Sequence, residues 1–177
     1  GSSGGLVGSM QENSSINNSF ATGDVIAMQS NKNSFGGLVG YVPDGDNKTI
    51  TKSYSAGAVR NNTGVTGTSS RGGLIGNLGT GTNVNIGDNY WNATANPSFN
   101  VSTGGSGNGT VNSGISALTA SQMKSASNFS SAFGNTAGSF AAASGWGYQS
   151  GVNGGFPIRC GITQCTAYDS SLFALTY

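Results

Sequence analysis

The sequence contains no histidine, and only 7% of its 177 residues are charged. Histidine is the commonest general base and the usual partner of serine and cysteine nucleophiles, so its absence removes those catalytic arrangements. The four lysines and three arginines are scattered and the net charge is +1, which provides no basic surface for nucleic acid. No apolar run approaches the roughly 18 residues of a membrane-spanning helix. Nucleic-acid binding and a membrane span are therefore not expected.

The acidic residues are also few, and none forms an evident catalytic pair. A glycosidase needs two carboxylates held across a cleft, whereas Asp24 and Asp88 fall on turns that are far apart. The segment Asp44-Gly45-Asp46-Asn47 could offer oxygen ligands to calcium, but it supplies fewer acidic ligands than a usual calcium loop. The same residue types are favoured in tight turns. We expect a turn here, no enzyme activity, no metal and no cofactor.

What the sequence does contain is a repeated pentapeptide. Gly-Gly-Leu-Val-Gly occurs at residues 4–8 and 36–40, and Gly-Gly-Leu-Ile-Gly follows at residues 72–76. A self-similar period of about 30–40 residues is typical of stacked-repeat architectures. Paired glycines allow close packing at a corner where a Cβ would clash. The pentapeptide therefore predicts equivalent corners in successive repeats.

A second motif follows the first in the same order. Its copies begin at Ile16 and Ile50 and read Ile-x-x-Ser-aromatic, whereas the copy at Ile86 keeps only the isoleucine and the aromatic residue. Short strands joined by turns rich in Asn, Gly, Ser and Thr predict an all-β fold, a β-solenoid (β-helix-like) of about three coils. One inward side chain of each strand would stack on its equivalent in the next coil. The expected internal ladders are Leu6, Leu38 and Leu74; Ile16, Ile50 and Ile86; and Phe20, Tyr54 and Tyr90.

The remainder of the chain lacks this pattern. Residues 99–117 are rich in Gly, Ser and Asn and are expected to be a loop or linker. Thr119-Ala120-Ser121-Gln122 resembles a helix-capping box, and aromatic residues follow it. We expect a small C-terminal cap with one short helix over the end of the solenoid. The predicted segments are a repeat solenoid (1–98), a loop (99–117), an aromatic-rich cap with a cysteine loop (118–165) and an apolar strand (166–177).

The only two cysteines, Cys160 and Cys165, are separated by four residues. They could close a disulfide-stapled turn, which would indicate an oxidising compartment. The alternative is a pair of free thiols. Metal binding is disfavoured, because two cysteines without histidine cannot complete a tetrahedral site. We expect the disulfide.

The two motifs together resemble the GLUG repeat of large bacterial surface proteins, which include filamentous-haemagglutinin-like adhesins. Asn89-Tyr90-Trp91-Asn92 looks like the element that follows the last repeat in such proteins, and residues 118–158 are similar to their trailing segment. The resemblance covers residues 4 to about 158. It implies a secreted or surface-exposed location and a binding or scaffolding role, and it supplies no catalytic residues.

The expected function is a non-catalytic extracellular adhesive or stalk module. The alternative is a self-assembling extracellular filament subunit joined by coil stacking or by strand addition of residues 172–177. Partners would be a cell-surface glycan or protein receptor, or further copies of the chain. Trp91, Trp146 and Tyr148 could stack on sugar rings, although aromatic residues more often fill a core. An ice-binding surface is disfavoured because no regular threonine array recurs in the repeats.

Overall fold

The computed structural model describes residues 1–28, 33–65, 69–79, 82–107 and 113–160. These residues form two compact units, Gly1–Ala120 and Ser121–Tyr177, which we describe separately. Strands predominate and helices are few and short, so the fold is all-β. None of the helices in the described ranges has the length and hydrophobicity that crossing a bilayer requires.

Unit 1 (Gly1–Ala120) contains three successive repeats and a shorter fourth segment. Repeat 1 (residues 2–27) contains β1 (Ser2–Gly4), β2 (Val7–Ser9), β3 (Ser15–Asn17), β4 (Phe20–Ala21) and β5 (Val25–Ala27). Repeat 2 (residues 34–61) contains β6 (Ser34–Gly36), β7 (Val39–Val42), β8 (Gly45–Thr51), β9 (Tyr54–Ser55) and β10 (Val59–Asn61). Repeat 3 (residues 70–92) contains β11 (Ser70–Gly72), β12 (Ile75–Leu78), β13 (Thr82–Gly87) and β14 (Asn89–Asn92). The fourth segment (residues 104–118) ends in β15 (Ile115–Leu118).

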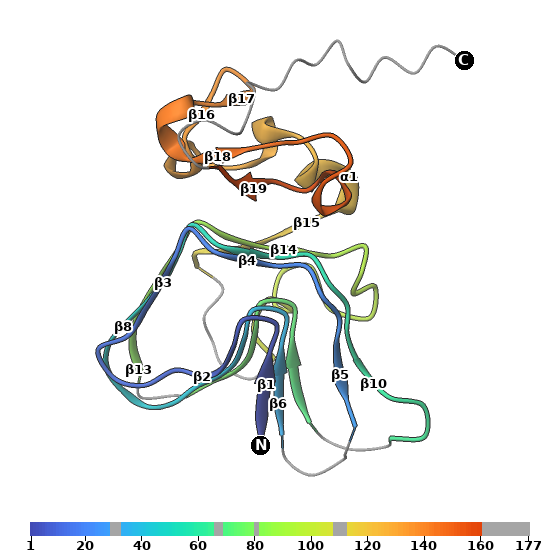
Figure 1. Ribbon diagram of the computed structural model, residues 1–177. Coiled ribbons are helices and arrows are strands. Elements are labelled where there is room, and N and C mark those ends of the chain that lie inside the picture. Colours follow the sequence, from blue (N-terminus) through green and yellow to red (C-terminus); the bar gives the residue numbers. More distant parts are fainter. Residues whose placement is uncertain (29–32, 66–68, 80–81, 108–112, 161–177) are drawn as a thin grey trace. The chain divides into compact units, whose positions relative to one another are not determined.

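Equivalent strands of successive repeats pair with one another, always in parallel (Figure 1). The five sheets have the orders β1-β6-β11, β12-β7-β2, β13-β8-β3, β15-β14-β9-β4 and β10-β5. Ile50 pairs with both Ile16 and Ile86, and Tyr54 pairs with both Phe20 and Tyr90. The register of the strands thus follows the alignment of the repeated motifs.

The glycine pair sets how closely the repeats approach. A Cβ on Gly36 would lie only 1.9 Å from the carbonyl oxygen of Val39 and 2.5 Å from the amide nitrogen of Gly76 in the next repeat. At the second glycine of repeat 3, Gly73, a Cβ would lie 2.4 Å from the indole ring of Trp91. Since carbon atoms do not approach this closely, both positions require glycine for packing.

The main core of unit 1 lies between the pentapeptide strands and the isoleucine strands. Leu38, Leu74 and Ile50 are fully buried in it, and Trp91 is 1% exposed. Leu6 departs from the expected internal ladder, because 48% of it is exposed. Its amide donates to the carbonyl of Leu38 (3.0 Å), but among the described residues no repeat precedes it to cover its other side.

Polar side chains connect the repeats at the turn between the isoleucine strand and the aromatic strand. The Oγ of Ser53 accepts a hydrogen bond from the amide of Ser19 (3.1 Å), and the Oδ1 of Asn89 accepts one from the amide of Ser53 (3.1 Å). Asn89 is fully buried, and its Nδ2 donates to the carbonyl oxygens of Ile50 (2.7 Å) and Gly114 (3.3 Å). Repeats 2 and 3 therefore each provide a side-chain acceptor for a backbone amide of the repeat before it.

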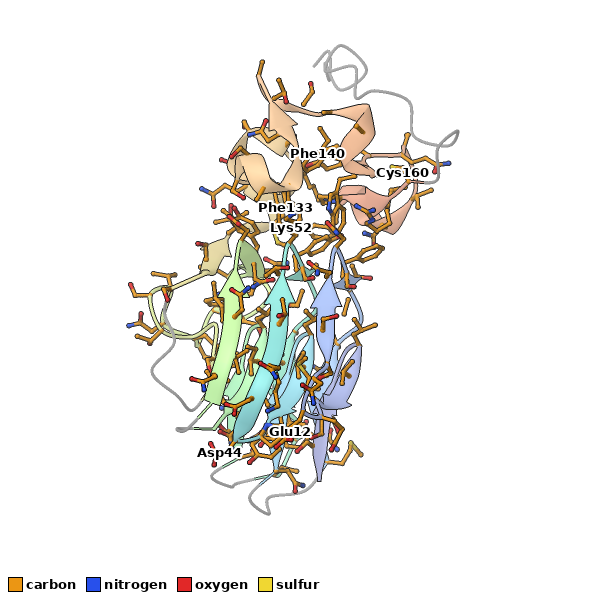
Figure 2. All side chains as sticks on the ribbon, turned by 90° about the vertical axis from the view of Figure 1, so that its left-hand side faces the viewer. Glu12, Asp44, Lys52, Phe133, Phe140 and Cys160 are labelled. Carbon is orange, nitrogen blue, oxygen red and sulfur yellow. The ribbon has the colours of Figure 1, made fainter. Side chains whose placement is uncertain are left out.

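Unit 2 (Ser121–Tyr177) contains short elements around an aromatic cluster. They are α1 (Ala120–Met123), which begins at the unit boundary, η1 (Ala126–Asn128), η2 (Ser131–Phe133), β16 (Asn135–Thr136), β17 (Ser139–Phe140), η3 (Ala142–Ser144), β18 (Trp146–Gly147), η4 (Asn153–Gly155) and β19 (Ile158–Arg159). The strands form two antiparallel pairs, β16-β17 and β18-β19. The rings of Phe133 and Phe140, labelled in Figure 2, each lie 5.0–5.5 Å from the ring of Phe129.

Two predictions fall outside the described residues. The Cys160–Cys165 disulfide requires Cys165, and the apolar strand comprises residues 166–177; neither is described. Both stay predictions.

Candidate functional site

The acidic segment of residues 44–47, at the start of β8, has its polar groups engaged within unit 1. Figure 2 shows Glu12 and Asp44 near the same end of this unit. Lys48 is 1% exposed, and its Nζ donates to the backbone carbonyl of Asp44 (3.3 Å). Asp46 accepts a hydrogen bond from the Nδ2 of Asn83 in repeat 3 (2.7 Å). Within the described ranges, no three acidic or cysteine side chains are grouped so as to hold a metal ion. The expected turn is therefore limited to Asp44, because Gly45, Asp46 and Asn47 already belong to β8, and Asp46 bonds to the next repeat.

The three aromatic residues considered for sugar stacking are buried. Trp91 is 1% exposed, Trp146 is 3% and Tyr148 is 7%. Trp91 packs on Gly73 and faces the ring of Phe99, with the two ring centroids 6.1 Å apart. Their burial favours the alternative that aromatic residues of this kind fill a core, and stacking on sugar rings stays a prediction. The three side chains contribute apolar area to the cores.

The candidate site is instead a hollow of about 300 Å³ in unit 1, beside β11. It lies between the start of repeat 3 and the loop that leads into the fourth segment. Its lining combines one cationic side chain, one aromatic ring, hydroxyl and amide groups, and backbone. The residues are Ser69, Arg71, Ser98, Phe99, Asn100, Thr103, Gly104, Ser106 and Gly107.

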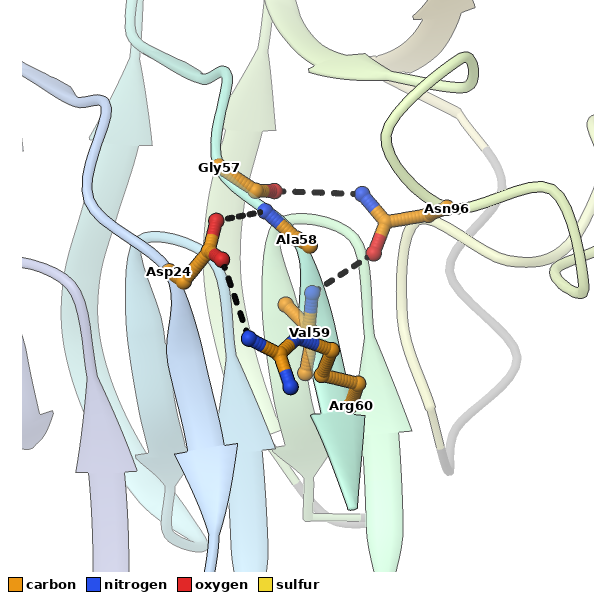
Figure 3. A network of polar contacts seen from close by, with 6 residues as sticks. All are labelled: Asp24, Gly57, Ala58, Val59, Arg60 and Asn96. Carbon is orange, nitrogen blue, oxygen red and sulfur yellow. Dashed lines mark hydrogen bonds and ion pairs between the residues drawn. The ribbon is translucent and has the colours of Figure 1, made fainter. Parts of the chain in front are cut away.

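The loop that forms one wall of the hollow is held at its start by Asn96, which is 3% exposed. Repeat 3 lacks the Gly-x-Val strand, and the Asn96 side chain takes its place against β10 (Figure 3). Its Oδ1 accepts a hydrogen bond from the amide of Val59 (2.7 Å), and its Nδ2 donates to the carbonyl of Gly57 (3.2 Å). The amide group thus reproduces the donor and acceptor of a neighbouring strand and fixes the start of the loop.

A tight turn carries the chain from Asn96 to the fourth segment. The amide of Phe99 donates to the carbonyl of Asn96 (3.0 Å). The carbonyl of Asn100 then accepts bonds from the amides of Thr103 (3.3 Å) and Gly104 (2.6 Å). A Cβ on Gly104 would lie 2.6 Å from that same carbonyl oxygen, so the turn needs glycine there. These contacts hold Phe99 over the hollow.

Arg71 supplies the charge. It lies on β11 opposite Phe35, and its guanidinium carbon lies 5.7 Å from the centroid of the Phe99 ring. A guanidinium over an aromatic face is attracted by the ring quadrupole, and its N–H donors can still bind a carboxylate or phosphate-like anion. None of the residues that line the hollow is acidic.

Two serine hydroxyls beside the hollow lack hydrogen-bond partners. The Oγ atoms of Ser69 and Ser106 are both buried, and neither makes a hydrogen bond. A buried polar group without a partner costs about 1–3 kcal/mol. Since a serine hydroxyl reorients by rotation about one bond, each can turn toward a ligand or water in the hollow. The lining of the hollow is therefore polar, with two hydroxyl groups that no other residue engages.

The fourth copy of the glycine corner, which forms the far wall, was not recognised in the sequence. The amide of Leu74 donates to the carbonyl of Gly105 (3.0 Å), just as the amide of Leu38 donates to Leu74 (2.9 Å). Residues 104–107 (Gly-Gly-Ser-Gly) therefore occupy the pentapeptide position, within the segment 99–117 that is expected to be a loop. The signal was present, because residue 104 follows residue 72 by the same 32 residues that separate residues 4 and 36.

No family model, no curated protein and no solved structure matches this chain.

Proposed function

We propose that the chain is a non-catalytic, extracellular adhesive or stalk module of a bacterial surface protein. In this proposal unit 1 is a β-solenoid of about three coils related to the GLUG repeats, and unit 2 is its C-terminal cap. The observation that carries the proposal is the in-register parallel pairing of equivalent strands across repeats. Stacked repeats make elongated surfaces that serve for spacing or for binding.

The exposed side chains support the same function. Asn47 donates through Nδ2 to the Oδ1 of Asn13 (3.0 Å), and Thr51 donates to the side chain of Asn17. These uncharged groups bond across repeats on the exposed face. A surface of this kind offers hydrogen bonds without strong electrostatic steering. It suits contact with a glycan or protein receptor, and equally a protease-resistant spacer.

The proposal can be tested with beads that carry the purified chain. We expect folded chain, but not chain unfolded before coupling, to attach beads to host or bacterial cells and to resist digestion by a nonspecific protease. Rapid cleavage of the folded chain, together with no attachment to any cell type, would contradict both the adhesive and the stalk form.

A second candidate is a self-assembling filament subunit. Within the described residues, β1 to β5 each pair on one side only. Leu6 in repeat 1 is 48% exposed, and Met28, which follows the repeat directly, is 66% exposed. Unpaired strand edges are templates for strand addition. Light scattering and electron microscopy over a concentration series should show growing fibres if this is the function. A constant monomer mass would exclude it.

A further inference from the structure

We propose that the hollow beside Arg71 is a binding site for an acidic sugar, that is, a glycan unit that carries a carboxylate or sulfate group. The proposal rests on the adhesive function and names the chemistry of its ligand. It requires a cation that is not already neutralised, polar groups that match sugar hydroxyls, and an apolar surface for a sugar ring. The hollow has all three.

The cation is Arg71. The other arginine nearby in the repeats, Arg60, lies 3.5 Å from the carboxylate of Asp24 and is half exposed. Arg71 has no such partner among the residues that line the hollow, and its guanidinium packs on the Phe99 ring. Because a guanidinium presents N–H groups in a plane, it can bind a carboxylate or sulfate with two parallel hydrogen bonds.

The polar groups surround this cation. Ser98, Asn100 and Thr103 are exposed at the rim, and Ser69 and Ser106 hold the two buried hydroxyls that lack partners. All five are uncharged, and hydroxyl groups can both donate and accept, as a ring of sugar hydroxyls requires.

The apolar surface is Phe99, which is partly exposed and is fixed from behind by the ring of Trp91. A volume of about 300 Å³ lies at the lower end of the range for small-ligand sites. A single sugar residue fits such a site. A free inorganic anion would use Arg71 alone and would leave the ring and the rim hydroxyls without contacts, and an acidic peptide would need more than one cation to be held selectively.

Binding can be measured by nuclear magnetic resonance on the full chain. Glucuronate, glucose 6-sulfate, glucose and inorganic sulfate are added separately, each up to about 10 mM, to detect the weak affinities expected of single sugars. We expect both anionic sugars to shift the signals of Arg71, Phe99 and Thr103, and glucose and sulfate ion to shift them little. Stronger binding of glucuronate than of the sulfate ester would identify uronic acids as the source, and the reverse would identify sulfated glycans.

Two variants locate the effect. Arg71→Gln should weaken binding of the anionic sugars by at least about tenfold, because a charge-assisted bidentate contact is lost. Arg60→Gln removes an arginine from the adjacent repeat and should leave binding unchanged. An unaltered amide spectrum away from the hollow shows that each variant is folded.

Several results would overturn the proposal. One is that glucose, sulfate ion alone or an acidic peptide binds as strongly as glucuronate or more strongly. Another is that no ligand shifts any signal at any concentration. A third is that Arg71→Gln and Arg60→Gln bind the anionic sugars with equal affinity. The bead assay separates this failure from that of the adhesive function. If neither anionic sugar binds but the beads still attach to cells, adhesion is retained and the site is excluded. If glucuronate binds but the beads attach to no cell, the site is retained and adhesion is excluded.

Discussion

Replacement of Gly36 by alanine should disrupt the stack at its centre. The added Cβ would lie 1.9 Å from the Val39 carbonyl oxygen, 2.5 Å from the Gly76 amide nitrogen and 2.8 Å from the Leu74 carbonyl oxygen. All three atoms belong to the backbone, and two of them belong to the next repeat. No side-chain rotation can relieve the overlap, so the backbone of the repeat 2 corner must change and the strands of repeats 2 and 3 must move apart.

The expected loss in the free energy of unfolding is at least about 3 kcal/mol, the upper part of the range for overpacked sites, because three fixed contacts are violated together. Domains are stable by only about 5–15 kcal/mol, so a loss of this size is readily measured. Urea unfolding can be followed by far-ultraviolet circular dichroism and by tryptophan fluorescence, to which buried Trp91 contributes. The midpoint and slope of each curve give the difference in the free energy of unfolding between the variant and the original chain.

The matched control is Gly23→Ala. Nothing lies within 4 Å of a Cβ at Gly23, and its backbone is not in the left-handed region. This variant should be unchanged or stabilised by about 0.4–1 kcal/mol, because alanine restricts the unfolded chain. If Gly36→Ala and Gly23→Ala unfold at the same urea concentration, the repeats are not packed as closely as described, and the explanation of the pentapeptide fails.

Substitutions at two further residues, Asn89 and Asn96, test the polar contacts that connect the repeats. Asn89→Ala should lower the free energy of unfolding by about 1–3 kcal/mol for each buried group left unpaired. Asn89→Ser should recover part of this loss, because it keeps an acceptor for the Ser53 amide. Equal unfolding midpoints for the two variants would contradict this. Asn96→Asp keeps the acceptor for the Val59 amide but loses the donor to Gly57, so hydrogen exchange at Val59 should stay slow in this variant and become faster in Asn96→Ala.

The pairing of strands across repeats could be anticipated where a motif was repeated in full. The isoleucine and aromatic positions mark strands in all three copies, and the glycine pairs mark the corners. Burial was harder to anticipate at the ends of the repeat series. Leu6 has the same neighbours in sequence as Leu38, yet its exposure depends on whether another repeat lies against it.

The candidate site could not be predicted because its parts carry no motif of their own. Arg71 stands between a serine and the glycine pair, and nothing in that sequence indicates that Phe99 lies across from it. Residues 104–107 were missed because they have the glycines of the pentapeptide but neither Leu nor Val. Close approach of backbones depends on the glycines, so the corner forms without the apolar residues. The role of Asn96 is likewise visible only in three dimensions.

Because of the Asn96 side-chain amide, the two edges of the small β5-β10 sheet also differ from each other. At the β10 edge, the side chain of Asn96 occupies the carbonyl of Gly57 and the amide of Val59. A side chain, unlike a strand, does not provide a new edge for a further strand. At the β5 edge, no described strand is paired. An incoming strand would therefore meet occupied groups at the start of β10 but not along β5, so growth by strand addition would favour the β5 edge.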